Sequence, residues 1–105
     1  GLWAQWRLEE AGGGLRAPGE SVTLSCQVSN STFQGYSFRW YRRAPGGSLE
    51  WMSLISYSGG VKKYGAAVEG RATASRDSYQ SQSSLVLRAL RRSDSARYFC
   101  AVRTG

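Results

Sequence analysis

A two-layer antiparallel β-sandwich is the fold that the sequence predicts, and three observations carry this prediction. Short segments alternate between apolar and polar residues with a period of two, Gly-rich turns separate these segments, and no stretch shows the apolar period of a helix. The chain has 105 residues, of which 41% are hydrophobic, and this length suffices for one domain with its own core. No apolar run approaches the roughly 18 residues that a membrane-spanning helix needs.

The alternation of side chains is clearest in the first predicted strand. Val22, Leu24, Cys26 and Val28 alternate with polar residues and therefore share one face, which we expect to point into the core. Further strands are expected at residues 38–42, 49–57, 61–64, 71–76, 84–90 and 96–100. Turns are expected at residues 18–19, 44–47 and 58–60, where Pro or Gly interrupts the pattern.

The two cysteines, Cys26 and Cys100, are too few for a tetrahedral zinc site and too far apart for a redox motif. A single disulfide between the two sheets is the favoured interpretation, and two buried free thiols are the alternative. Closing so long a loop would stabilise the fold by about 4 kcal/mol. The disulfide implies an oxidising, extracellular compartment. The sequon that begins at Asn30 agrees with this location, and Asn30 is a candidate glycosylation site.

Two aromatic residues stand at positions that a sandwich with an inter-sheet disulfide requires. Trp40 lies on the strand that follows the first cysteine, and Tyr98 lies two residues before the second. We expect Trp40 to pack over the disulfide and the Tyr98 hydroxyl to bond to the backbone of the preceding corner. Core packing is the simpler interpretation of each aromatic residue alone, and it agrees with this assignment.

Composition argues against catalysis and against a metal or cofactor. The chain contains no histidine, so it has no imidazole general base, nucleophile activator or metal ligand. The net charge of +7 would attract polyanions non-specifically. However, Arg88, Arg91 and Arg92 are expected at one end of the sandwich, away from the other basic residues, so they form no continuous stripe. We therefore predict a solvated basic surface, no nucleic-acid partner, no metal and no cofactor.

Four segments of the chain resemble the variable domain of an immunoglobulin heavy chain, and the resemblance extends over nearly the whole chain from Gln5. These segments are residues 10–15, 44–51, 70–77 and 94–101. The resemblance implies a V-type two-sheet Greek-key sandwich. It also implies two structural ion pairs, Arg71 with Asp94 and Arg42 with Glu50, near the base of the sandwich.

The resemblance further implies that three loops at one end form a binding surface, at residues 30–37, at residues 56–63 and from residue 102 onward. The candidate ligand-binding residues are Gln34, Gly35, Tyr36, Ser37, Ser56, Tyr57, Ser58, Lys62, Lys63, Val102, Arg103 and Thr104. Tyrosine, serine and glycine in such loops suit ligand recognition, because a rigid ring supplies contact area at low entropic cost. If the lysines and Arg103 cluster, they favour an acidic epitope.

A second surface is implied where antibody heavy chains contact a light chain. Its candidate residues are Tyr41, Arg43, Leu49, Trp51 and Phe99. Arg43 stands where the family has a glutamine, and Tyr41 replaces a small aliphatic residue. These departures argue against pairing with an ordinary light chain. They resemble the solitary domains of heavy-chain-only antibodies and of unconventional mu- or delta-type T-cell receptors.

The function implied by the resemblance is antigen recognition by a variable domain of an adaptive immune receptor, in particular a solitary heavy-like domain of an unconventional T-cell receptor. An antibody heavy-chain domain that pairs with a light chain and a cell-surface adhesion or co-signalling domain are the alternatives. The expected partners are a protein or other antigen and further domains of the same receptor, with membrane attachment only through other parts of the receptor. We expect an extracellular location, at the cell surface or secreted.

The family pattern continues beyond Gly105 with the remainder of the third loop and a final strand. We therefore expect residues 1–105 to form one variable-type domain that is incomplete at the third loop and last strand.

Overall fold

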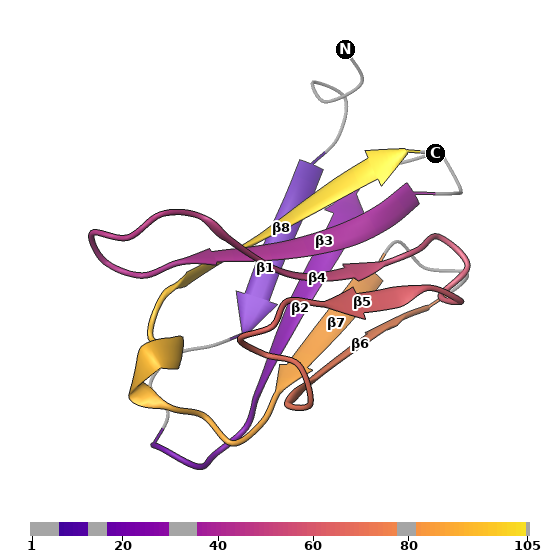
Figure 1. The fold of residues 1–105 in the computed structure, drawn as a ribbon. Helices are drawn as coiled ribbons and strands as arrows, with labels where there is room; N and C mark the ends of the chain where they lie inside the picture. The colour runs from indigo at the N-terminus through magenta and orange to yellow at the C-terminus, as the bar shows by residue number, and fades with distance from the viewer. Residues whose placement is uncertain (1–6, 13–16, 30–35, 78–81, 105) are drawn as a thin grey trace.

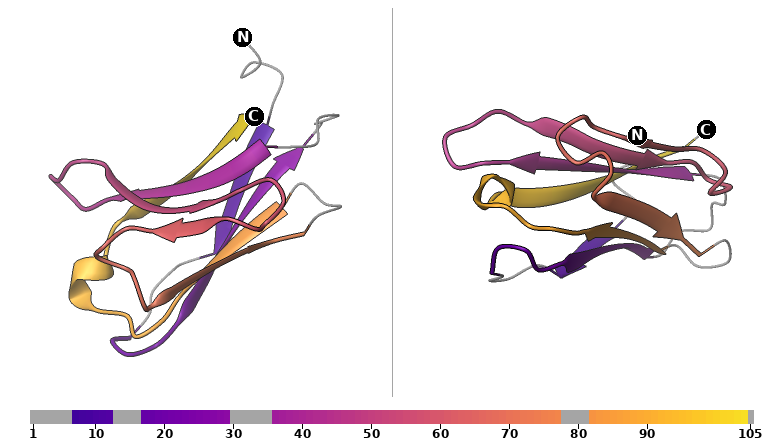
Figure 2. Two further views of the ribbon diagram at one scale, coloured as in Figure 1. Left: turned by 45° about the vertical axis from the view of Figure 1, so that its right-hand side comes forward. Right: turned by 60° about the horizontal axis from the view of Figure 1, so that its bottom comes forward.

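The computed structural model describes residues 7–12, 17–29, 36–77 and 82–104, which form two packed antiparallel sheets (Figure 1). In the first sheet the strands follow the order β1 (Arg7–Gly12), β2 (Val22–Ser29), β7 (Gln82–Leu87) and β6 (Ala72–Arg76). In the second sheet the order is β5 (Lys62–Tyr64), β4 (Glu50–Ile55), β3 (Tyr36–Arg43) and β8 (Arg97–Thr104). Figure 2 shows the two sheets stacked as separate layers. The predicted all-β sandwich is therefore confirmed.

Strands β2 to β8 match the seven predicted segments, with differences at their ends, whereas β1 has no counterpart among the predicted ranges. β3 begins at Tyr36 and β8 continues to Thr104, because the two strands pair along their whole lengths, from Tyr36 with Thr104 to Arg43 with Arg97. The strand predicted at residues 84–90 instead runs from Gln82 to Leu87. The chain leaves the sheet at this point, since the Leu90 amide bonds to the Glu20 carbonyl. A one-turn 3-10 helix, η2 (Arg92–Asp94), then leads into β8.

The core lies between the two sheets and is built by inward-facing positions of both. On β2, Val22, Leu24 and Cys26 are buried, as the alternation predicted. Phe38 and Trp40 of β3 are also fully buried and share the core face. The other large buried side chains are Met52, Ile55, Val68, Leu85, Leu87 and Val102. The period of two therefore reports correctly which face of β2 and of β3 is removed from water. On β4 the alternation is interrupted, because a register shift in its pairing with β3 leaves the adjacent Met52 and Ser53 both buried.

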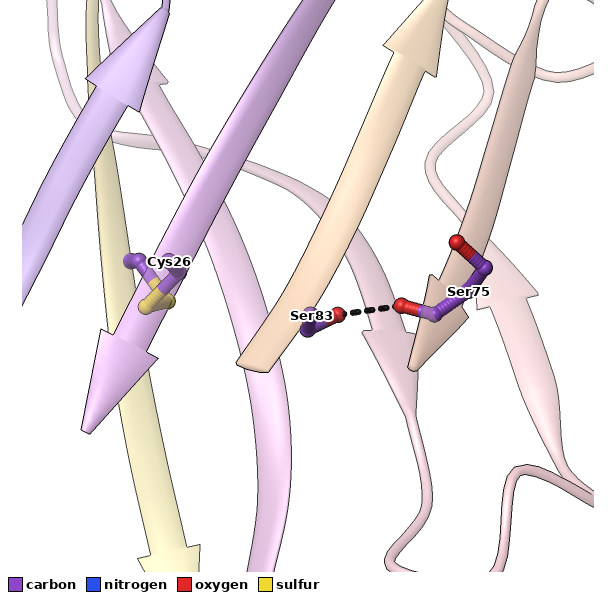
Figure 3. Close-up of a disulfide and its surroundings, with 4 residues drawn as sticks. Cys26, Ser75 and Ser83 are labelled. Atoms are coloured by element: carbon purple, nitrogen blue, oxygen red, sulfur yellow. Dashed lines mark hydrogen bonds between the residues drawn. A yellow bond between two sulfur atoms is a disulfide. The ribbon is translucent and has the colours of Figure 1, made fainter. Parts of the chain in front are cut away.

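A disulfide joins Cys26 of β2 in the first sheet to Cys100 of β8 in the second, across 74 residues of sequence (Figure 3). Trp40 is the cross-strand partner of Cys100 and belongs to the same buried cluster. Beside the disulfide, the Ser83 hydroxyl donates a 2.7 Å hydrogen bond to the Ser75 carbonyl and satisfies a buried polar group (Figure 3). The predicted inter-sheet bridge is confirmed.

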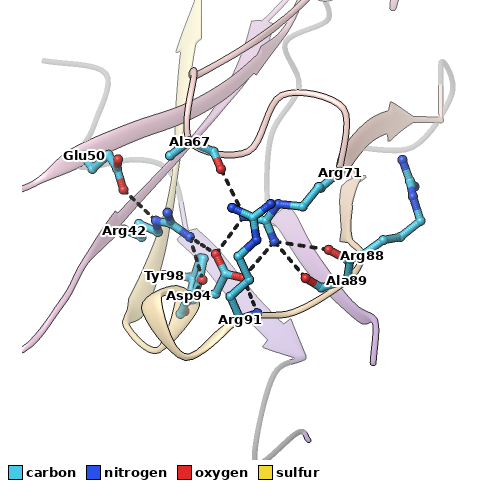
Figure 4. Close-up of polar contacts among 9 residues, drawn as sticks. All are labelled: Arg42, Glu50, Ala67, Arg71, Arg88, Ala89, Arg91, Asp94 and Tyr98. Atoms are coloured by element: carbon cyan, nitrogen blue, oxygen red, sulfur yellow. Dashed lines mark hydrogen bonds and ion pairs between the residues drawn. The ribbon is translucent and has the colours of Figure 1, made fainter. Parts of the chain in front are cut away.

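A polar network closes the base of the sandwich around the buried carboxylate of Asp94 (Figure 4). The structure contains both ion pairs that the resemblance implied: Arg71 Nη1 lies 2.8 Å from Asp94 Oδ2, and Arg42 Nε lies 2.6 Å from Glu50 Oε1. A third pair, which the sequence did not indicate, joins Arg42 Nη1 to Asp94 Oδ1 at 2.8 Å. The Tyr98 hydroxyl donates to the Asp94 carbonyl, which is the expected tie to the preceding corner. One carboxylate thus connects the second sheet, η2 and the turn before β6.

The charge state of Asp94 follows from its surroundings. Burial alone would raise the pKa of this carboxyl, but hydrogen bonds from Arg71, from the Arg91 amide and from Arg42 outweigh it and hold the pKa well below its usual range. Burial similarly opposes the charge of Arg42, yet its bonds to Glu50 and Asp94 raise its pKa. Asp94 and Arg42 are therefore charged throughout the physiological range, and the role of their ion pair is structural.

Candidate functional site

The expected loop end and the Asp94 network lie at opposite ends of the second sheet. Because β3 runs antiparallel to both β4 and β8, the start of β3, the end of β4 and the end of β8 meet at one end. The turn between β4 and β5 closes at this same end, to the right in Figure 1, whereas η2 lies to the left. The topology therefore gathers residues 36–37, 56–61 and 103–104 into one region.

The turn between β4 and β5 is held by hydrogen bonds from its own residues. The Ser56 amide donates to the Val61 carbonyl at 2.9 Å, and the Val61 amide donates back to the Ser56 hydroxyl at 3.0 Å. The Gly59 amide donates to the Ser56 carbonyl at 3.0 Å, and Gly59 itself has a φ of +80°, a conformation that suits glycine. This closed turn leaves the Tyr57 side chain 58% exposed. Tyr57 is thus exposed to solvent on a turn whose backbone is held by hydrogen bonds.

Arg76 of β6 holds this turn from the first sheet. Its Nη1 donates a 3.1 Å hydrogen bond to the Ser56 carbonyl, and its guanidinium lies 4.8 Å from the centre of the buried Phe38 ring. In the sequence, Arg76 belongs to the heavy-chain-like segment at residues 70–77, and nothing in that segment indicates this positioning role. The contact joins residues far apart in the chain, so no local pattern could have revealed it.

The structure places the other candidate ligand-binding residues as follows. Ser58 lies in the turn, where its hydroxyl accepts a 3.2 Å bond from the Gly60 amide. Ser37 lies on β3, and its hydroxyl donates to the Arg103 carbonyl at 3.4 Å. Lys62 and Lys63 are exposed on β5, but consecutive residues of a strand point to opposite faces. By the strand register, Lys63 lies on the same outer face of the second sheet as Arg103, and Lys62 has the opposite orientation. Recognition of an acidic epitope by these basic residues stays a prediction.

The boundaries of the predicted loops also need correction. Val102 is not a loop residue: it lies on β8 opposite Phe38 and is 1% exposed, because the inward-facing alternation of β8 continues past Cys100. Thr104 likewise lies on β8 and Tyr36 on β3, so the sheet extends further toward this end than predicted. Gln34, Gly35 and Asn30 lie outside the described residues.

The candidate partner residues come together on the outer face of the second sheet. Tyr41 on β3 is the cross-strand partner of both Trp51 on β4 and Phe99 on β8, so the three form a row. Trp51 is 36% exposed and Leu49, immediately before β4, is 61% exposed. Arg43 is exposed at the end of β3, two residues beyond Tyr41. The structure therefore assembles this surface, although its residues span much of the sequence.

A comparison with protein families provides the identification, since a model of the immunoglobulin V-set domain matches residues 15–105. The chain belongs to the immunoglobulin V-set family. This family is not catalytic, and its members typically bind proteins. The disulfide of this V-set domain indicates an extracellular location.

Two features are absent from the described part of the V-set domain. No cluster of three or more Cys, Asp or Glu side chains there could hold a metal ion. No helix in the described ranges has the length and apolar character needed to cross a membrane.

Proposed function

We propose that this V-set domain recognises a protein antigen through the loop end of its second sheet, as a variable domain of an adaptive immune receptor. The observation that carries the proposal is the turn between β4 and β5. Its own hydrogen bonds hold the backbone of this turn, and Tyr57 is exposed on it. A rigid, exposed tyrosine gains contact area without losing much side-chain entropy on binding. Arg103, exposed near the end of β8, adds a charged group at the same end.

Within this proposal the receptor is an unconventional T-cell receptor, and the domain is a solitary heavy-like domain. The support is the set of segments that resemble heavy chains together with the exposed Arg43, which departs from the family glutamine at the pairing surface. Other domains of the same receptor would be its neighbours and would supply any membrane attachment. The domain would act at the cell surface or as a secreted protein, with a glycan on Asn30 and no nucleic-acid partner.

A second candidate function is favoured by the aromatic row of Tyr41, Trp51 and Phe99. Adhesion and co-signalling domains of the V-set type recognise partners through a sheet face, and an antibody heavy-chain domain would use the same face to pair with a light chain. The exposed Leu49 beside this row fits a function of this kind. Fold alone does not choose between the loop end and the sheet face.

The test is to screen the purified domain against an array of secreted and membrane-protein ectodomains, and then to compare variants against each protein that binds. Tyr57→Ala should weaken the binding of a loop-end ligand at least tenfold, whereas the matched control Thr73→Ala, on the exposed face of β6, should not change it. If Trp51→Ser abolishes binding and Tyr57→Ala leaves it unchanged, recognition occurs through the sheet face and the loop-end proposal is wrong.

A further inference from the structure

Three exposed arginines, Arg88, Arg91 and Arg92, lie close together at the base of the first sheet, and we refer to them as the arginine corner. Arg88 directly follows β7, and Arg91 and Arg92 lead into η2. Because successive Cα atoms are about 3.8 Å apart, the Cα atoms of Arg88 and Arg92 are separated by at most about 15 Å. The corner lies at the base of the sandwich with η2, opposite the turn that exposes Tyr57 (Figure 1).

Hydrogen bonds hold the backbone that carries the arginine corner. Arg71 Nη1 donates to the Arg88 carbonyl at 3.2 Å and to the Ala89 carbonyl at 3.3 Å (Figure 4). The Leu90 amide donates to the Glu20 carbonyl at 3.0 Å. The arginines are therefore presented on a backbone that is fixed from two sides, and this lowers the entropy cost of ordering them around a ligand.

The positive charge of the arginine corner is not neutralised within the described part of the domain. No carboxylate of the described residues lies within ion-pair distance of its three guanidinium groups. Asp94 is near in sequence, but it is already bonded to Arg42 and Arg71. The Glu20 carboxylate accepts a hydrogen bond from the Ala17 amide in its own turn. Three positive charges without a counter-charge therefore face solvent within a small area.

The outer face of the first sheet continues from this corner as a surface of hydroxyl groups. Two cross-strand rows run over β2, β7 and β6, and five of their six side chains carry a hydroxyl: Thr23, Val86, Thr73, and then Ser25, Ser84, Ser75. Arg88 reaches this face, because its Nη1 donates a 2.9 Å hydrogen bond to the Thr73 hydroxyl. The acidic residues of this sheet, Glu9 and Glu10, belong to β1, at the opposite edge from β6. The face thus offers neutral hydrogen-bonding groups beside guanidinium groups.

We propose that the arginine corner and the adjoining hydroxyl face of the first sheet bind a sulfated polysaccharide of the glycosaminoglycan class. A guanidinium group matches the oxygens of an oxyanion with two parallel N–H bonds, and a sulfate provides such oxygens. The hydroxyls of Thr73 and its neighbours both donate and accept, so they can exchange hydrogen bonds with sugar hydroxyls. Sulfated polysaccharides occur outside the cell, in the compartment that the disulfide indicates.

A polysaccharide fits this face better than a nucleic acid or a lipid surface does. Single-stranded nucleic acids are held by stacking of bases on aromatic side chains, and β2, β7 and β6 contain no aromatic residue. Binding at a lipid surface buries apolar side chains, and the half-buried Val86 is the one apolar side chain in the two rows. The face is separate from the loop end, so the inference goes beyond the proposed antigen recognition and does not depend on it.

The probe is a heparin oligosaccharide of defined length, and its Kd is measured by isothermal titration calorimetry at physiological salt. The R88Q+R91Q+R92Q variant should raise the Kd at least tenfold, because it removes the charge-assisted hydrogen bonds of the corner. The matched control, K62Q+K63Q+R103Q, removes the same net charge from exposed positions at the other end and should raise the Kd less than threefold. The difference between the two variants separates a site from non-specific attraction to a basic protein.

Two further comparisons test the chemistry of recognition. R88K+R91K+R92K keeps the charge but lacks the planar fork of the guanidinium group, so it should raise the Kd at least threefold. A single-stranded oligonucleotide with as many charges as the oligosaccharide should bind the unchanged domain at least tenfold more weakly, because the face has no stacking platform. Circular dichroism checks that each variant is folded. If the glutamine triple fails to fold, R91Q+R92Q is compared with K62Q+K63Q instead.

Four outcomes would overturn the proposal. If the oligosaccharide does not bind, the corner is no saccharide site. If the two glutamine triples weaken binding equally, net charge alone attracts the probe. If the lysine triple binds as tightly as the unchanged domain, the guanidinium groups are not recognised as such. If the oligonucleotide binds as tightly as the oligosaccharide and loses as much affinity with the corner variant, the corner is a general polyanion surface.

Discussion

Replacing Asp94 with alanine tests whether the network at the base of the sandwich stabilises the fold. Asp94 is 5% exposed and forms ion pairs at 2.8 Å with both Arg42 and Arg71, and Arg42 is itself only 6% exposed. Removing the carboxylate leaves the buried Arg42 without its partner Asp94. Because breaking a buried ion pair from one side typically costs about 3 to 5 kcal/mol of stability, we expect a loss of this size. This is a large share of the roughly 5 to 15 kcal/mol that stabilises a domain of this size.

The assay is unfolding by urea and by heat, followed by circular dichroism with the disulfide intact. Asp94→Ala should lower the free energy of unfolding by about 3 to 5 kcal/mol and the Tm by at least about 12 °C. The matched control is Glu50→Gln, which breaks the one ion pair whose carboxylate is 48% exposed and should therefore cost less than about 1 kcal/mol. Equal losses for the two variants would contradict the argument that burial decides the contribution of each carboxylate.

The pH dependence gives a second readout of the same carboxylate. The pKa of Asp94 is held below its usual value, so its contribution is fully present above the unfolded pKa of about 3.9 and is lost as pH falls toward the lower folded value. The unchanged domain should therefore lose stability steeply between about pH 5 and pH 2, and the alanine variant should show a flatter profile. Parallel profiles would show that other groups govern acid unfolding.

Three other changes probe the disulfide, the tyrosine corner and the turn. Reducing the Cys26–Cys100 disulfide should remove about 4 kcal/mol of stability, seen as a lower urea midpoint with reductant than without. Tyr98→Phe deletes the hydroxyl that bonds to the η2 backbone and should cost about 1 kcal/mol; an unchanged midpoint would refute that role. Arg76→Met removes the anchor of the turn between β4 and β5, so hydrogen exchange at the Val61 amide should accelerate several-fold; unchanged protection would mean that the turn supports itself.

Local sequence patterns predicted those features that depend on one strand at a time. The alternation through Val22, Leu24 and Cys26 showed which face is buried, because side chains on a strand have a period of two. The cysteine count together with Trp40 and Tyr98 predicted the bridge between the sheets. The heavy-chain-like segments then suggested which charged residues would meet at the base.

Features that depend on which residues face one another across strands were decided only by the tertiary structure. Pairing between β3 and β8 carries the sheet to Thr104 and buries Val102, which the sequence assigned to a loop. The same register sets Arg43 against Arg97. Register and long-range contacts bring together residues that are distant in the chain, so one-dimensional patterns determined the strands and the disulfide, whereas packing determined the surfaces available for recognition.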